Sequence, residues 1–187
     1  MTSHRGSLWR KWDFHVHTPA SYEWRGGRKF CDMTSSDERD DACQVVLKAM
    51  QAAEPAVFTV MDYWTFDGYL ALKEFLRRRS DFQFNKVLFP GMELRVEAPT
   101  RVRLNVHVML DDTLSNQQLQ DFRFMLEVLH IERPLSDESL AAVGRSMNDD
   151  IVRRVGETIA SRQTTAGCLR IGQKTALVTR ESLFKAL

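Results

Sequence analysis

Short strand-like runs alternate with longer stretches of helical spacing along almost the whole chain, and this order constrains the fold more than any other feature. Apolar, β-branched or alternating residues predict strands at 12–17, 56–61, 87–89, 92–97, 101–110 and 175–178. Helical periodicity fills the intervals at 35–53, 68–79, 115–130, 137–146, 150–162 and 181–187. Strands that alternate with helices favour an α/β fold, built on either an open parallel sheet or a barrel.

The length fits one domain. A chain of 187 residues can bury a real core but leaves little for a second one. We expect a single domain over residues 1–187, with an N-terminal arm at 1–11 and a long loop at 18–34, where glycine, arginine and aromatic residues follow no period. The last helical pattern stops without a cap, so we expect the native protein to continue or the C-terminal end to be truncated.

The composition excludes several classes of protein. Lys plus Arg (26) nearly equals Asp plus Glu (25), which argues against a strongly basic nucleic-acid binder but leaves a local basic patch open. No apolar stretch is long enough to span a membrane, and the N-terminus lacks the apolar run of a signal peptide, so we expect no membrane partner. Three widely spaced cysteines predict a reducing, cytoplasmic setting.

The first predicted strand carries two histidines at a spacing that suits a metal site. Period two places Phe14 and Val16 on one face and Asp13, His15 and His17 on the other. Two imidazoles could then converge on one cation while the carboxylate orients one of them. Satisfied core histidines are the alternative interpretation.

Three further strands each supply a polar group from a face that should otherwise be apolar. Asp62 closes one apolar run, and Glu93 and His107 lie opposite apolar neighbours in the next two strands. Burying such groups without partners costs several kcal/mol, and a shared metal ion would compensate all of them. The alternatives are that Asp62 caps the following helix and that Glu93 pairs with Arg95 or Arg103.

The ligand types indicate the chemistry. Nitrogen and oxygen donors without a thiolate suit Zn, Mn or Fe better than Mg or Ca. Such ions activate water and polarise phosphoryl oxygens, so the residues predict metal-assisted phosphoester hydrolysis, and hydrolysis of C–N bonds is compatible with the same ligands. Arg25, Arg28 and Lys29 in the following loop could hold a substrate phosphate, or they could be ordinary loop charges.

Four segments together resemble a known family. Residues 12–19 (WDFHVHTP) resemble the first motif of PHP (polymerase and histidinol phosphatase) domains. Residues 60–63 (VMDY), 90–93 (PGME) and 105–108 (NVHV) resemble the next three motifs in the family's order. The sequences of 6–12 (GSLWRKW) and 62–69 (DYWTFDGY) are most similar to the N-terminal PHP region of TrlF-like, AAA-type ATPases. The resemblance covers roughly residues 6–110.

The resemblance implies a distorted (β/α)7-type PHP barrel, incomplete in this chain, with divalent metal ions at the carboxyl ends of its strands. By position, His15, His17 and Glu93 would hold a first ion, and Glu93 with His107 would hold a second. Two ions of Mn, Zn or Fe are therefore expected.

The remaining motif positions imply supporting roles. Asp13 would orient a ligand, and Asp62 would lie beside a third metal position, so both are expected among the catalytic residues. Tyr63 stands where the family often has a histidine, which argues against a third ion because a phenol ionises only near pH 10.

The chain also departs from the family pattern. It contains neither the C-terminal Asp-x-His pair nor a Gly-rich nucleotide-binding loop. We expect a metal-dependent phosphoesterase or nuclease acting on a phosphoester, with nucleic acid as one candidate substrate. The alternative is a degenerate PHP module that serves as a non-catalytic scaffold or regulatory domain for an ATPase segment or partner.

Overall fold

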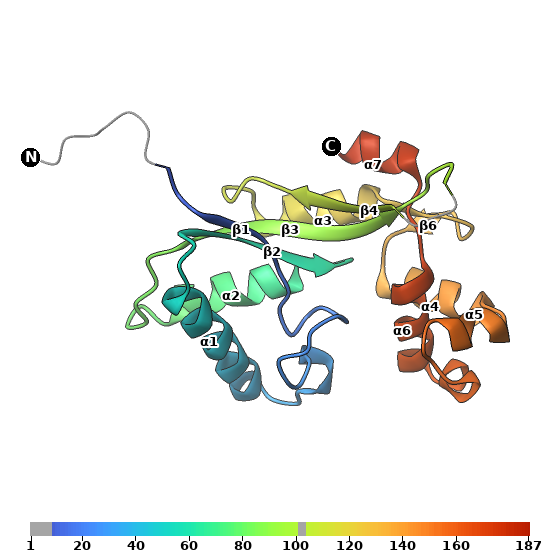
Figure 1. The fold of residues 1–187 in the computed structure, drawn as a ribbon, viewed down its shortest axis with the longest axis horizontal. Coiled ribbons are helices and arrows are strands. Elements are labelled where there is room, and N and C mark those ends of the chain that lie inside the picture. Colours follow the sequence, from blue (N-terminus) through green and yellow to red (C-terminus); the bar gives the residue numbers. More distant parts are fainter. Residues whose placement is uncertain (1–8, 101–103) are drawn as a thin grey trace, which may run out of the picture.

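The computed structural model describes residues 9–100 and 104–187 of the chain. Residues 1–8 of the expected N-terminal arm and residues 101–103 of the expected strand 101–110 lie outside this part. Figure 1 shows the elements in order: β1 (Trp12–Val16), α1 (Ser36–Ala52), β2 (Val57–Tyr63), α2 (Asp67–Arg78), β3 (Val87–Val96), β4 (Leu104–Met109), α3 (Asn116–Met125), β5 (Glu127–Val128), β6 (Arg133–Pro134), α4 (Asp137–Ser146), α5 (Asp149–Arg154), α6 (Thr165–Thr175) and α7 (Arg180–Ala186).

The main sheet is a curled half-barrel of four strands in the order β1-β2-β3-β4, and the predicted α/β class is confirmed. The strands β1, β2 and β3 are parallel, but β4 runs antiparallel to β3, so an entirely parallel sheet is wrong for this part of the chain. The connection from β3 to β4 is too short for the helical crossover that a parallel pairing requires, since only residues 97–103 separate the two strands.

The two faces of the sheet have different surroundings. Phe58 and Asp62 of β2 lie level with Leu88 and Met92 of β3 and face the core that α1 and α2 cover. The alternate residues, which include Tyr63 and Glu93, face the other side of the sheet. Figure 1 shows α1 and α2 together on one side of the strands.

An irregularity in β1 changes which of its side chains share a face. Asp13 pairs with Phe58 and Val16 with Val60, so β1 carries one more residue than β2 over this interval, as in a β-bulge. The prediction that Phe14 and Val16 share a face is therefore wrong. Phe14 is exposed and stacks on Trp12, whose ring also stacks on Phe89, whereas Val16 packs against the core.

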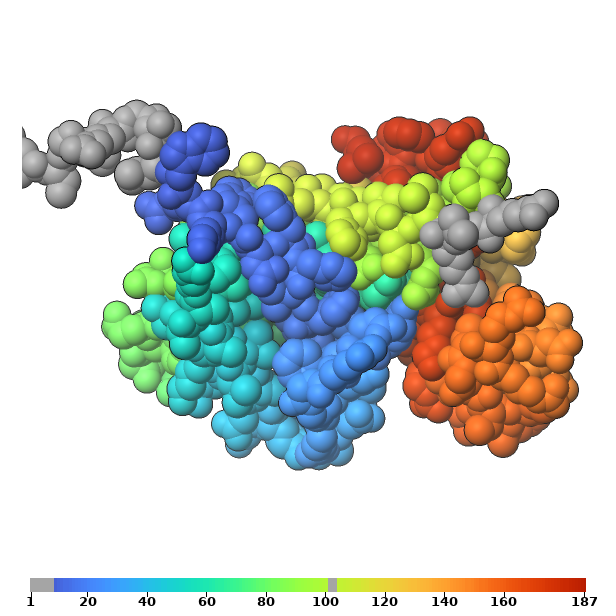
Figure 2. All heavy atoms as spheres, in the orientation of Figure 1, coloured from blue at the N-terminus to red at the C-terminus, as the bar shows by residue number. Residues whose placement is uncertain are grey.

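The long loop at 18–34 contains only one short helical turn, at Phe30–Asp32, in agreement with the prediction. The loop ends at α1, where Ser35 and Glu38 form the expected capping box. In Figure 2 the blue atoms of β1 and of this loop occupy the front of the molecule.

The C-terminal third differs most from the prediction. The helix expected at 115–130 ends at Met125, and the expected strand at 175–178 is instead the end of α6 followed by two isolated bridges of Val178. The helical pattern at 150–162 divides into α5 and a 3-10 turn at Ile159–Gln163. The helix α6 was not predicted because its glycines lower helix propensity. A Cβ on Gly172 would lie 1.8 Å from the Leu140 carbonyl oxygen, so this glycine lets α6 pack closely on α4.

Two general features complete the fold. In the described part of the chain, no helix combines the length and apolar character needed to cross a membrane. The three cysteines, Cys31, Cys43 and Cys168, are all unpaired thiols, and only Cys31 is exposed.

Candidate metal centre

Glu93 lies at the centre of the candidate site. It occupies β3, level with Tyr63 of β2 and His107 of β4, and only 3% of the residue is exposed. Its Oε2 atom lies 3.0 Å from His15 Nε2 and 3.7 Å from His17 Nε2, while its Oε1 atom lies 3.6 Å from His107 Nε2. The structure therefore brings together all four residues that the sequence analysis predicted as metal ligands.

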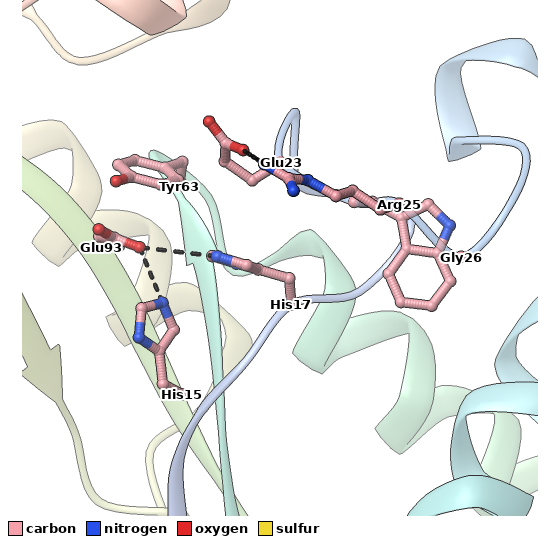
Figure 3. Close-up of a pocket in the computed structure, with 8 residues that line it drawn as sticks. His15, His17, Glu23, Arg25, Gly26, Tyr63 and Glu93 are labelled. Carbon is pink, nitrogen blue, oxygen red and sulfur yellow. Dashed lines mark hydrogen bonds and ion pairs between the residues drawn. The ribbon is translucent and has the colours of Figure 1, made fainter.

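Three of these residues form a group that could hold a metal ion. The ligand atoms of His15, His17 and Glu93 all lie within 4.8 Å of one another. Figure 3 shows the two imidazoles pointing at the same carboxylate oxygen from the end of β1 and the start of the loop. Two histidines and one carboxylate are a donor set that occurs in catalytic zinc and iron sites, so these residues fit such an ion.

The bulge in β1 explains how the imidazoles of His15 and His17 both come to lie beside Glu93. With Val16 turned to the core, its neighbours His15 and His17 project together toward the opposite side, where Glu93 lies. The two rings meet edge to face with centroids 4.8 Å apart. The half-exposed His15 borders solvent, and His17 is more deeply placed.

The electrostatic environment favours a neutral His17. Burial and the neighbouring His15 lower the pKa of the His17 imidazole, and their effect exceeds the opposite effect of Glu93. A neutral imidazole has the free lone pair that a metal ligand requires.

Asn105 and Tyr63 hold the other side of Glu93. The Asn105 amide Nδ2 donates to Glu93 Oε1 at 2.8 Å and to the Tyr63 hydroxyl at 2.9 Å. Burial and the hydrogen bond to Glu93 strongly raise the pKa of Tyr63, so the phenol stays protonated. The sequence analysis did not select Asn105, although its position two residues before His107 places both side chains on one strand face.

The alternative pairing of Glu93 with Arg95 is not present. The Arg95 guanidinium donates instead to the Gln173 carbonyl at 2.7 Å and to the Tyr22 hydroxyl. It also lies 4.9 Å from the centroid of the Tyr63 ring. Arg103 lies outside the described residues.

Asp13 and Asp62, predicted to assist catalysis, make other contacts. The Asp13 carboxylate accepts from the backbone N–H of His15 at 3.1 Å, and not from an imidazole of the described residues. Asp62 lies on the helix-covered face, fully buried, and accepts from the Thr18 N–H at 2.7 Å and from the Thr18 hydroxyl at 2.6 Å. Burial raises the pKa of Asp62 to about 7.

A surface pocket of about 500 Å³ adjoins the histidines. Its lining consists of both histidines, Glu93, Tyr63 and a segment of the long loop, Glu23 to Gly26. Arg25 is the one of the three predicted phosphate-binding residues that lines it, and its side chain is 90% exposed, 3.7 Å from Glu23.

The other two predicted cations are engaged elsewhere. Arg28 pairs with Glu38 at 2.6 Å, and Lys29 donates to the Tyr22 carbonyl. Lys29 lines a second pocket of about 660 Å³, between the loop, α2 and α6.

Comparison with known proteins assigns no family. No protein-family model matches the sequence, and no curated protein is significantly similar to it. The geometry around Glu93 is therefore the basis for any functional conclusion.

Proposed function

We propose that this chain is a metal-dependent phosphoesterase module of the PHP type, whose centre is built from His15, His17 and Glu93. The observation that carries the proposal is the convergence of three imidazoles, from two separate segments, on one buried carboxylate. These residues follow one another along the chain in the same order as the corresponding motifs of the PHP family, which the sequence resembles.

The donor set suits a divalent ion of Zn, Mn or Fe. When bound, such an ion would supply Lewis acidity toward a phosphoryl oxygen and would acidify water. Glu93 would neutralise part of its charge, and the neutral His17 would offer a lone pair from Nε2. A second ion, as the resemblance implies, would require Glu93 Oε1 and His107.

The pocket suggests how a phosphoester would be held. Arg25 is long and exposed, so it can bring its guanidinium to a phosphate placed beside the histidines. Tyr63 and Trp24 provide aromatic walls for the alcohol portion of the ester. A nucleotide unit is one alcohol portion that fits aromatic walls.

We infer that the four-stranded half-barrel forms one part of a larger barrel of the PHP type. Trp12 and Phe14 expose 41% and 53% of their surfaces, and Phe89 stacks beside them on the face that carries Glu93. Further strands would cover these rings in a closed barrel.

A non-catalytic scaffold is the second candidate, and the same exposed rings favour it, since an apolar sheet face suits the docking of a partner such as an ATPase segment. Metal-dependent turnover would distinguish the two candidates.

The test is hydrolysis of bis(4-nitrophenyl) phosphate and 4-nitrophenyl phosphate by the chain loaded with Mn²⁺ or Zn²⁺. The proposal predicts turnover that chelation and the His15→Ala/His17→Ala variant abolish. Arg25→Ala should raise KM by about tenfold with little change in kcat, while Arg145→Ala, at an exposed position on α4, should change neither. Metal binding without turnover of any phosphoester would favour the scaffold, and turnover of C–N substrates alone would indicate an amidohydrolase.

A further inference from the structure

The two oxygens of Glu93 have different partners. Oε2 faces the imidazoles of His15 and His17, whose nitrogens can act as metal ligands. Oε1 faces the Asn105 amide, which donates a hydrogen bond and has no lone pair to offer on that nitrogen. The carboxylate is therefore divided into a side open to a cation and a side held by the protein.

The Oε1 side has less capacity left for an ion than the Oε2 side. A carboxylate oxygen has about two lone-pair sites. Asn105 takes one of them at 2.8 Å. The same amide also donates to the Tyr63 hydroxyl at 2.9 Å, which fixes the amide beside Oε1.

The net charge of the centre also favours one ion over two. Glu93 is the one carboxylate in the group of ligand atoms found among the described residues. One divalent ion beside it leaves a net charge of about +1, whereas two leave about +3 at short range, where repulsion between the ions is large.

We propose that Asn105 is a positioning residue that limits this centre to one divalent ion, held by His15, His17 and Oε2 of Glu93. The inference rests on the proposed metal site and concerns how many ions that site accepts. His107 then borders the centre without holding an ion of its own, although it lies 3.6 Å from Oε1 and its ring meets that of His15 at 4.4 Å.

Replacing the amide donor should change the number of ions. In Asn105→Asp a carboxylate replaces the donor next to Oε1 and His107, which removes the hydrogen bond and adds a ligand with a negative charge. We expect Mn²⁺ binding to rise from about one to about two ions per chain. The further change His107→Ala in this variant should return the number to about one.

The experiment is equilibrium dialysis of the chain against Mn²⁺, with elemental analysis and electron paramagnetic resonance. The wild type and His107→Ala should each bind about one ion with the spectrum of an isolated Mn²⁺, and Asn105→Asp should show the spectrum of a coupled pair. Asn116→Asp is the matched control, because Asn116 is exposed at the start of α3 and should leave the count at one. If Asn105→Asp does not fold, Asn105→Ala removes the donor to Oε1 without adding charge and should also admit a second ion.

The outcomes separate this inference from the proposed function. Two ions in the wild type, or one ion in every folded variant that lacks the Asn105 amide, would overturn the limit set by Asn105 and leave the metal site intact. No ion in the wild type would overturn both proposals.

Discussion

Two buried carboxylates on neighbouring strands of the same sheet have opposite surroundings. Asp62 on β2 accepts two hydrogen bonds from Thr18 and faces the core, whereas Glu93 on β3 faces three imidazoles on the other side. Asp62 lies level with Met92, one residue from the level of Glu93. Asp62 binds the start of the loop to the sheet through Thr18, whereas Glu93 lies among three imidazoles.

The comparison shows that burial alone does not identify a metal-binding carboxylate. Fixed N–H and O–H donors of Thr18 reach both oxygens of Asp62, and no imidazole faces it among the described residues, so nothing around it suggests a cation site. Imidazole nitrogens can present lone pairs, so a cation would stabilise the arrangement around Oε2 of Glu93 more than the arrangement around Asp62.

The largest expected effect is on the Glu93 side. His15→Ala/His17→Ala should weaken Mn²⁺ or Zn²⁺ binding by at least about 100-fold, because two of three donors are lost. The free energy of unfolding of the metal-free chain should change by less than about 1 kcal/mol, since His15 is half-exposed and His17 is only partly buried. Calorimetric titration and urea unfolding measure the two effects. A variant that binds the ion as tightly as the wild type would place the site elsewhere.

The Asp62 side should respond in the opposite way. Asp62→Ala leaves the fully buried Thr18 N–H and hydroxyl without their acceptor, so the free energy of unfolding should fall by about 3 kcal/mol at pH 5. Urea unfolding of the metal-free chain checks this value, with Asp13→Ala as the control at a carboxylate of the same sheet that is not fully buried. An unchanged stability would mean that the hydrogen bonds to Thr18 contribute nothing.

The contact between Asp62 and Thr18 also depends on a nearby glycine. A Cβ at Gly68 would lie 2.0 Å from both Asp62 Oδ2 and Thr18 Oγ1, so Gly68→Ala should destabilise the fold by about 2 kcal/mol. Gly27→Ala is not a suitable control because its backbone has a positive φ of 131°. Gly68→Ser should cost at least as much as Gly68→Ala, and a neutral result for both would show that the contact relaxes freely.

The most gradual expected effect is a dependence of stability on pH. Burial raises the pKa of Asp62 from 3.8 to about 7, so the folded chain binds the proton more tightly than the unfolded chain. The contribution of Asp62 to stability is then fully present below pH 4 and is lost as the pH rises toward 7, at up to about 1 kcal/mol per pH unit. Unfolding of the wild type and of Asp62→Asn at several pH values tests this, and parallel curves for the two proteins would contradict it.

The sequence could predict the alternation of strands and helices in the N-terminal part of the chain, and the four residues that meet at the candidate site, because both depend on local patterns. Period two places His15 and His17 together, and strand alternation places Glu93 and His107 away from their apolar neighbours. Capping boxes located the starts of α1 and α3 for the same reason.

The remaining features depend on register and packing, which the sequence does not display. The bulge in β1 shifts Phe14 and Val16 to different faces, and the face of Asp62 follows from its pairing with β3. The role of Asn105 can be recognised only from the pairing of β3 with β4, because this pairing brings Asn105 within hydrogen-bonding distance of Glu93. The helix α6 is stabilised by close packing on α4 rather than by its own propensity.

The most direct test of this account is calorimetric titration of Mn²⁺ into the wild type, Asp62→Asn and Glu93→Gln. Asn can still accept from the Thr18 N–H, so the Asp62 variant should fold and bind the ion as the wild type does, whereas the Glu93 variant should lose at least about 100-fold in affinity. Loss of binding in Asp62→Asn, or its retention in Glu93→Gln, would contradict the assignment of the metal centre to the Glu93 face of the sheet.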